Sequence, residues 1–111
     1  MKIKVIDEAK IYDILKDLGI PANFKGYKYI KDSIWIISNN RTTKMGELYK
    51  DIADKYSTTP AAVERGIRHS IEYIFNSTEL PDIIKNIFGK LDRKPRNGEF
   101  LFTIVEYLNT H

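Results

Sequence analysis

The chain has 111 residues, of which 42% are apolar and 12% aromatic, so it can form one domain with a buried core and is not a disordered tail. It has no cysteine, which excludes disulfides and thiolate metal sites, and no apolar run near the ~20 residues that span a bilayer. The net charge of +3 mildly favours a polyanionic partner, and because no signal peptide is evident after Met1, a cytoplasmic protein is expected.

The chain begins with a short segment whose side chains alternate between apolar and polar, as in a strand. Because no partner strand can be recognised, residues 1–6 are expected to form an extended arm. A first helix is predicted from Asp7 to Leu18, with its apolar residues at helical spacing along one side. Gly19 ends this helix, and the following Ile20-Pro21 supports the break.

A second helix is predicted from Gly26 or Tyr27 to Ser38. The apolar residues at helical spacing are Tyr27, Ile30, Ile34 and Ile37. Trp35 and Ile36 make the end of this helix apolar on all sides, which indicates deep burial. A polar loop over residues 38–43 follows.

The segment from Leu48 to Phe75 has the sequence form of a helix-turn-helix. Its first helix is expected over about Met45–Tyr56 and its second over Pro60–Asn76. Thr59 can cap the second helix, and Pro60 suits its first turn. The buried side of the second helix is predicted to hold Val63, Ile67, Ser70, Ile71 and Ile74. The opposite side carries Glu64, Arg65, Arg68, His69 and Glu72. A second helix with such a face can enter the DNA major groove.

A short helix is predicted from Pro81 to Phe88, followed by a basic loop, Lys90–Arg96, and a last helix that Asn97 caps and that ends at Asn109. The last helix carries more apolar residues than one buried face requires, which predicts a monomer in dilute solution that self-associates weakly, mainly on tandem DNA sites. The residues outside its Phe100–Ile104–Leu108 stripe are Leu101, Phe102, Val105 and Tyr107. No convincing strand remains, so the expected fold class is all-α: one six-helix domain over residues 1–111 that contains a helix-turn-helix.

The strongest candidates for reading DNA bases are Glu64, Arg65 and Arg68. Arginine can donate two hydrogen bonds to guanine O6 and N7, and glutamate can accept one from cytosine N4. The alternative is a solvated helix face on which Glu64 and Glu72 pair with Arg68 at i,i+4 spacing. The residues alone leave both interpretations open.

Nine further residues are candidates for contacts with the DNA backbone. They are Lys25, Lys28, Lys31, Thr59, His69, Lys90, Arg93, Lys94 and Arg96. Such contacts set position and affinity but carry no sequence information. The alternatives are a solvated face for the lysines of the second helix, a flexible charged loop for Lys90–Arg96, and packing at the helix edge for His69.

Other chemistry is not indicated. Two histidines without a cysteine do not favour a metal site, and no cofactor is expected. No nucleophile and base are arranged around a histidine, so an enzyme is not predicted.

Three segments resemble the DNA-binding effector domain of the sporulation master regulator, stage-zero sporulation protein A. They are GIPANFKGYKYIKDSI (19–34), LYKDIADKYSTTPAAVERGIRHSIE (48–72) and NGEFLFTIVEYL (97–108). The resemblance runs from about Ile11 to Leu108. In that family a receiver domain precedes this domain, and no receiver domain is recognised in this chain.

The resemblance implies that Glu64, Arg65 and Arg68 read bases in a short TGTCGAA-type box, which is often present in tandem. It implies that domains bind tandem boxes as head-to-tail pairs. It also implies contact with the sigma subunit of RNA polymerase through the region after the recognition helix, here about Asn76–Gly89, although this region matches the family poorly.

Ala61 and Ala62 depart from the family, which places polar or basic residues there to hold phosphates. Asn23 also stands where the family often has histidine. These departures keep a second interpretation open: a protein-interaction module that binds the full-length regulator or RNA polymerase and has little DNA affinity of its own. The retained triplet Glu64, Arg65 and Arg68 argues against that interpretation.

Overall fold

The computed structural model describes residues 6–111 and contains six helices in this part of the chain, with no strand. Their bounds are α1 Glu8–Leu18, α2 Lys25–Asn39, α3 Met45–Lys55, α4 Pro60–Phe75, α5 Asp82–Phe88 and α6 Asn97–Thr110. The all-α prediction and the position of the helix-turn-helix, α3 and α4, are confirmed.

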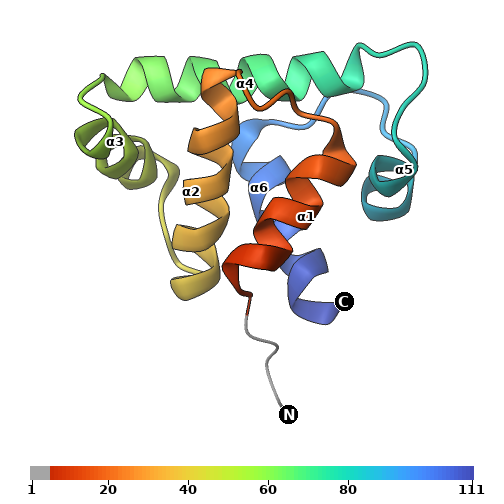
Figure 1. The fold of residues 1–111 in the computed structure, drawn as a ribbon, viewed down its shortest axis with the longest axis horizontal. Coiled ribbons are helices and arrows are strands. Elements are labelled where there is room, and N and C mark those ends of the chain that lie inside the picture. The colour runs from red at the N-terminus through yellow and green to blue at the C-terminus, as the bar shows by residue number, and fades with distance from the viewer. Residues whose placement is uncertain (1–5) are drawn as a thin grey trace.

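The helix α4 lies along one edge of the molecule, at the top in Figure 1, and the other helices lie below it. The central helix is α2, which descends from α4 and packs against α1, α3, α4 and α6. The short helix α5 packs against α6 and α1 at the end of the molecule opposite α3. One hydrophobic core joins all six helices. This arrangement leaves the outer side of α4 uncovered.

Local signals in the sequence explain where the helices begin and end. The side chain of Asp7 accepts a hydrogen bond from Lys10 N at 2.9 Å, and Gly19 ends α1 in the left-handed conformation with φ of +76°. Thr59 caps α4 by accepting from Ala62 N at 3.1 Å, and Pro60 is its first residue, as predicted. In the turn between α3 and α4, Ser57 has a φ of +53°.

The buried side of α4 agrees with the prediction. Val63, Ile67, Ser70, Ile71 and Ile74 are all buried. In α3, Leu48, Ile52 and Ala53 are buried against α4 and α2. The helix-turn-helix is therefore held by the apolar periodicity that predicted it.

The expected deep burial at the end of α2 was wrong, and two of the four residues that were expected to be surplus on α6 are buried. Trp35 is 51% exposed and Ile36 is only half-buried, because Ile34 and Ile37 already occupy the side of α2 that faces the core. In α6, Leu101 and Val105 are both fully buried, since α2, α4 and α5 pack around this helix. These two side chains are therefore not available to a neighbouring molecule.

The predicted start of the last helix also needs correction. Asn97 is the first residue of α6 and not its cap; the cap position is Arg96, whose N–H donates to the Glu99 carboxylate at 3.2 Å. The expected arm, residues 1–6, lies outside the described residues except for Ile6. Ile6 is buried in the core beside α1.

Candidate nucleic-acid interface

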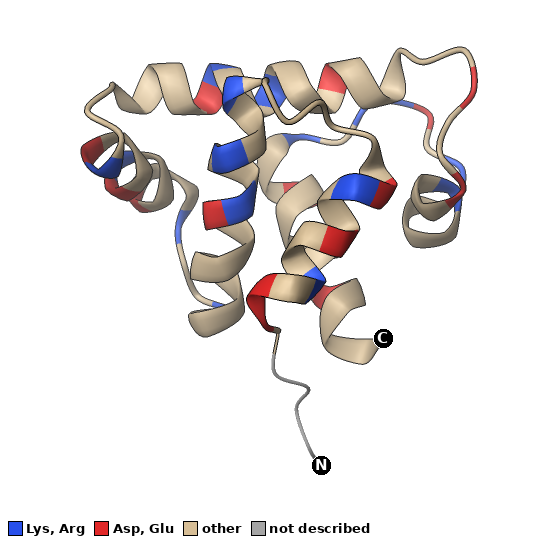
Figure 2. Cartoon of the chain, in the orientation of Figure 1, with Lys and Arg blue, Asp and Glu red and all other residues tan. Residues whose placement is uncertain are grey.

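The outer side of α4 exposes the side chains of Arg65 and Arg68. Successive residues of an α-helix are about 100° apart, so Arg65 lies near the middle of the exposed side. His69 lies about 40° from it on one side, and Arg68 and then Glu64 lie about 60° and about 100° from it on the other. Figure 2 shows Lys and Arg on α4 and on the adjoining end of α2. The predicted base-reading residues thus share one accessible ridge.

Close packing of two glycines holds the start of α2 against α4. A Cβ atom added at Gly26 would overlap the carbonyl oxygen of Gly66 and the hydroxyl oxygen of Ser70. A Cβ added at Gly66 would lie 2.9 Å from the ring of Tyr29. Only residues without a Cβ permit this approach of the two backbones. As a result, Lys25, at the first position of α2, lies beside the exposed ridge of α4.

We name the hollow along this side of the ridge the α2–α4 hollow. Its volume is about 490 Å³, and it is lined by Phe24, Lys25, Gly26, Ala62, Arg65, Gly66 and His69. The ring of His69 packs on Phe24 with the ring centroids 5.4 Å apart. His69 therefore packs against the residue that precedes α2, which agrees with the packing interpretation from the sequence. Its exposed ring also lines the hollow. The hollow brings together three predicted DNA contacts, Lys25, Arg65 and His69.

A second hollow lies along the other side of the ridge, and we name it the α4–α6 hollow. Its volume is about 450 Å³, and it is lined by Tyr49, Glu64, Arg68, Ile71, Glu72, Lys94, Pro95, Arg96, Asn97 and Gly98. Pro95 is buried, while Lys94 and Arg96 on either side of it are exposed. This hollow brings together Arg68, Lys94 and Arg96 from the prediction.

Arg68 already has carboxylate partners in the free protein. Its Nε donates to Glu64 Oε1 at 3.1 Å, and its NH1 lies 3.7 Å from Glu72 Oε1. These are the i,i+4 pairs that the sequence offered as an alternative. Exposed pairs of this kind contribute only about 0.3–0.5 kcal/mol, so Arg68 can exchange them for another acceptor at little cost. Among the described residues, Arg65 forms no ion pair.

The other residues that were predicted to contact the DNA backbone lie apart from the two hollows. The Lys28 ammonium lies 4.5 Å from the ring centroid of Tyr56, near the end of α3, and the Lys31 ammonium lies 5.7 Å from that of Tyr12 on α1. The Arg93 guanidinium donates to Glu99 at 2.9 Å, and this hydrogen bond holds the pKa of Glu99 below its ordinary value. Lys90 is exposed in the loop after α5. The two hollows beside α4 include Lys25, Lys94 and Arg96 but none of these four residues.

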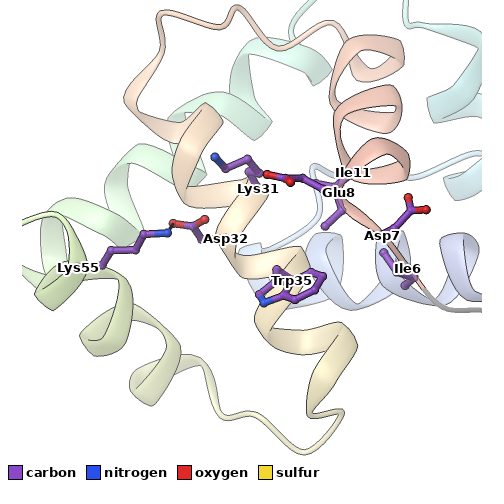
Figure 3. Close-up of a pocket in the computed structure, with 8 residues that line it drawn as sticks. All are labelled: Ile6, Asp7, Glu8, Ile11, Lys31, Asp32, Trp35 and Lys55. Atoms are coloured by element: carbon purple, nitrogen blue, oxygen red, sulfur yellow. Dashed lines mark ion pairs between the residues drawn. The ribbon is translucent and has the colours of Figure 1, made fainter.

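A third hollow, of about 390 Å³, lies between α1 and α2 and away from the ridge (Figure 3). Asp32 at its side accepts hydrogen bonds from Tyr56 at 2.6 Å and pairs with Lys55 at 3.1 Å, which ties α2 to the end of α3. The hydrogen bond with Asp32 raises the pKa of Lys55, and burial raises the pKa of Tyr56. Both groups therefore stay protonated at neutral pH, and the cluster fixes the turn that leads into α4.

Sequence reasoning missed one contact that supports the ridge. Asn97 is 8% exposed, and its amide nitrogen donates to Tyr49 Oη at 3.0 Å and to the carbonyl of Glu64 at 3.1 Å. It therefore joins α6 to both helices of the helix-turn-helix. The sequence suggested only a cap for Asn97. No local pattern could pair two residues that are 48 positions apart.

The described residues, 6–111, contain no group of three His, Cys, Asp or Glu side chains that could hold a metal ion. Within the same range no helix has the length and apolar character needed to cross a membrane. In a comparison with protein families, the family described as "Sporulation initiation factor Spo0A C terminal" matches residues 11–108.

Proposed function

This chain belongs to the Spo0A C-terminal family of DNA-binding regulatory domains, and we propose that it reads a short, specific site in duplex DNA with the exposed ridge of α4. A role in DNA binding and transcription regulation in sporulation follows from the family. The observation that supports the proposal is the ridge itself, with Arg65 and Arg68 exposed between two hollows that carry further cations.

The ridge has the dimensions and the chemistry for the major groove. The groove is about 12 Å wide and accepts one α-helix. Arg65 and Arg68 would each donate to guanine O6 and N7, and Glu64 would accept from cytosine N4. Arg68 would leave its two carboxylate partners to do so. This chemistry suits a TGTCGAA-like box, which contains both guanine and cytosine.

The cations beside the ridge would hold the two DNA strands. Lys25 in the α2–α4 hollow would meet phosphates on one side of the groove, and Lys94 and Arg96 in the α4–α6 hollow would meet phosphates on the other. His69 and the Thr59 hydroxyl are close enough to α4 for further contacts with the backbone. A regulator of this kind works where the chromosome is, in the cytoplasm.

A second candidate function is a protein-interaction module. The observations that favour it are the pairing of Arg68 with Glu64 and Glu72 in the free chain, and Ala61 at the start of α4, whose side chain offers no donor to a phosphate. In that case the segment from Asn76 to Gly89, or another surface, would bind RNA polymerase or the full-length regulator. The exposed, unpaired Arg65 makes DNA the better proposal.

Fluorescence anisotropy with two labelled duplexes tests the proposal. One duplex contains a TGTCGAA box and the other has the same bases in scrambled order. The intact protein should prefer the box, and Arg65→Ala should remove most of that preference while Lys85→Ala, an exposed change on α5, should leave it unchanged. Equal and weak binding to both duplexes by the intact protein would support the interaction module instead.

A further inference from the structure

We propose that Tyr49 contacts DNA directly, by donating a hydrogen bond from its hydroxyl to a backbone phosphate that lies in the α4–α6 hollow. This inference rests on the proposed function, because the phosphate belongs to the duplex that α4 reads. It adds an uncharged phosphate contact on α3 to the charged ones on the loop before α6.

Tyr49 lies beside the exposed ridge of α4. It lines the same hollow as Arg68 from α4 and Lys94 and Arg96 from the loop. Three separate elements therefore converge on one concave surface beside the exposed ridge. A strand of duplex DNA that flanks α4 in the groove would run along this surface.

The Tyr49 hydroxyl accepts one hydrogen bond and has a proton left to donate. Its oxygen accepts from the amide nitrogen of Asn97 at 3.0 Å, and an amide nitrogen can only donate. The same nitrogen donates to the carbonyl of Glu64 at 3.1 Å, which fixes the orientation of the amide. The hydroxyl proton of Tyr49 must therefore point elsewhere. No acceptor among residues 6–111 receives it.

Tyr49 is a neutral donor. Burial raises its pKa above the ordinary value of a tyrosine, so the hydroxyl keeps its proton at neutral pH. A neutral hydroxyl with one unused proton, next to cations, is suited to an anionic acceptor with several lone pairs. The phosphate group of DNA is such an acceptor.

Two carboxylates also line the hollow and oppose an anion there. They are Glu64 and Glu72 of α4. Both are near the guanidinium of Arg68, at 3.1 Å for Glu64 and 3.7 Å for Glu72, so Arg68 partly offsets their charge. The exposed cations Lys94 and Arg96 lie on the loop side, next to Asn97 in the chain. The phosphate would therefore lie on the side of the hollow that the loop forms. Asn97, which donates to the Tyr49 hydroxyl, directly follows this loop.

Tyr49→Phe tests the inference because it removes one oxygen and one proton and leaves the ring in place. We expect binding to be about five- to tenfold weaker on box and scrambled duplexes alike. The slope of log affinity against log salt should not change, because a neutral hydroxyl displaces no counterion, whereas Lys94→Ala should reduce the slope by about one unit. Tyr12→Phe, at an exposed tyrosine on α1, is the matched control and should bind like the intact protein.

The contacted phosphate can be found by replacing single phosphates of the box duplex with neutral methylphosphonates. At one position the replacement should weaken binding of the intact protein but not weaken that of Tyr49→Phe any further. Circular dichroism at the titration temperature should show both proteins folded. Unchanged affinity of Tyr49→Phe, a loss confined to the box, or no such position would overturn the inference. If the intact protein bound no duplex at all, the proposed function itself would fail.

Discussion

The contact between Gly26 and Gly66 predicts that a single methyl group at Gly26 destabilises the domain. Gly26→Ala would place a Cβ against the backbone carbonyl of Gly66 and the hydroxyl of Ser70. A backbone atom cannot rotate away, so α2 and α4 must separate. Overpacking of this kind costs about 1–3 kcal/mol, and the contact with backbone puts Gly26→Ala near the upper value. The higher helix propensity of alanine offsets about 0.5–1 kcal/mol of this, which leaves a net loss of about 2 kcal/mol.

Gly46→Ala is the matched control. Like Gly26, Gly46 is the second residue of its helix, but a Cβ there would have no atom within 4 Å. We expect Gly46→Ala to stabilise the domain by about 0.5 kcal/mol or more through helix propensity alone. Thermal melts followed by circular dichroism measure both variants. At about 4 °C per kcal/mol, the melting temperature should fall by about 8 °C for Gly26→Ala and rise by about 2 °C for Gly46→Ala.

The double variant Gly26→Ala with Ser70→Ala should regain only part of the loss, because it removes the overlap with the hydroxyl of Ser70 but not the overlap with the carbonyl of Gly66. If Gly26→Ala were as stable as Gly46→Ala, the two helices would not pack as closely as described. Lys25 would then have no fixed position beside the ridge of α4.

Four further predictions test other parts of the account. Arg65→Ala and Arg68→Ala should each cost about 1–3 kcal/mol on the preferred duplex in anisotropy titrations, and relax the preference at one base pair; an equal loss on random DNA would mean that they contact only the backbone. Neutralising Lys94 and Arg96 together should weaken binding to every duplex and reduce the salt slope by about two units, whereas Lys85→Ala, at an exposed position on α5, should change the slope little. Ile67→Ala, in the fully buried centre of α4, should lower the free energy of unfolding by about 2–5 kcal/mol in urea titrations, and a loss below 1 kcal/mol would mean that the site is not core. The hydrogen bond from Arg93 lowers the pKa of Glu99 in the folded protein, so the stability that this carboxylate contributes is present above its ordinary pKa and is lost as the pH falls through the folded pKa. Glu99→Gln should therefore make the melting temperature depend less on pH in acid, and an unchanged dependence would show that this ion pair does not contribute to stability.

The helix-turn-helix could be predicted because its signals are local. The cap Thr59, the following Pro60 and the apolar residues at helical spacing determine where α4 begins and which side it buries, and the structure agrees with each of them. The pairing of Arg68 with Glu64 and Glu72 could also be foreseen from i,i+4 spacing.

The features that could not be predicted depend on contacts between distant residues. Trp35 is apolar and lies in a helix, but whether another element covers it depends on how α1 and α3 pack, which the periodicity of α2 does not contain. The excess apolar residues of α6, Leu101 and Val105, meet helices far away in the sequence. The bond between Asn97 and Tyr49 crosses 48 residues and gives no pattern in either segment. The position of the basic loop relative to α4 could not be predicted either, and the fold shows that Lys94 and Arg96 line the same hollow as Arg68.

The central claim is that the exposed ridge of α4 reads a specific duplex sequence. A binding selection from random duplex DNA, carried out in parallel with the intact protein and with Arg65→Ala, tests this claim most directly. The account predicts that the intact protein enriches a short box containing guanine and cytosine, of the TGTCGAA type, and that Arg65→Ala loses the preference at one position of it. Enrichment of no sequence by the intact protein, or of the same sequence with equal strength by both proteins, would contradict the account.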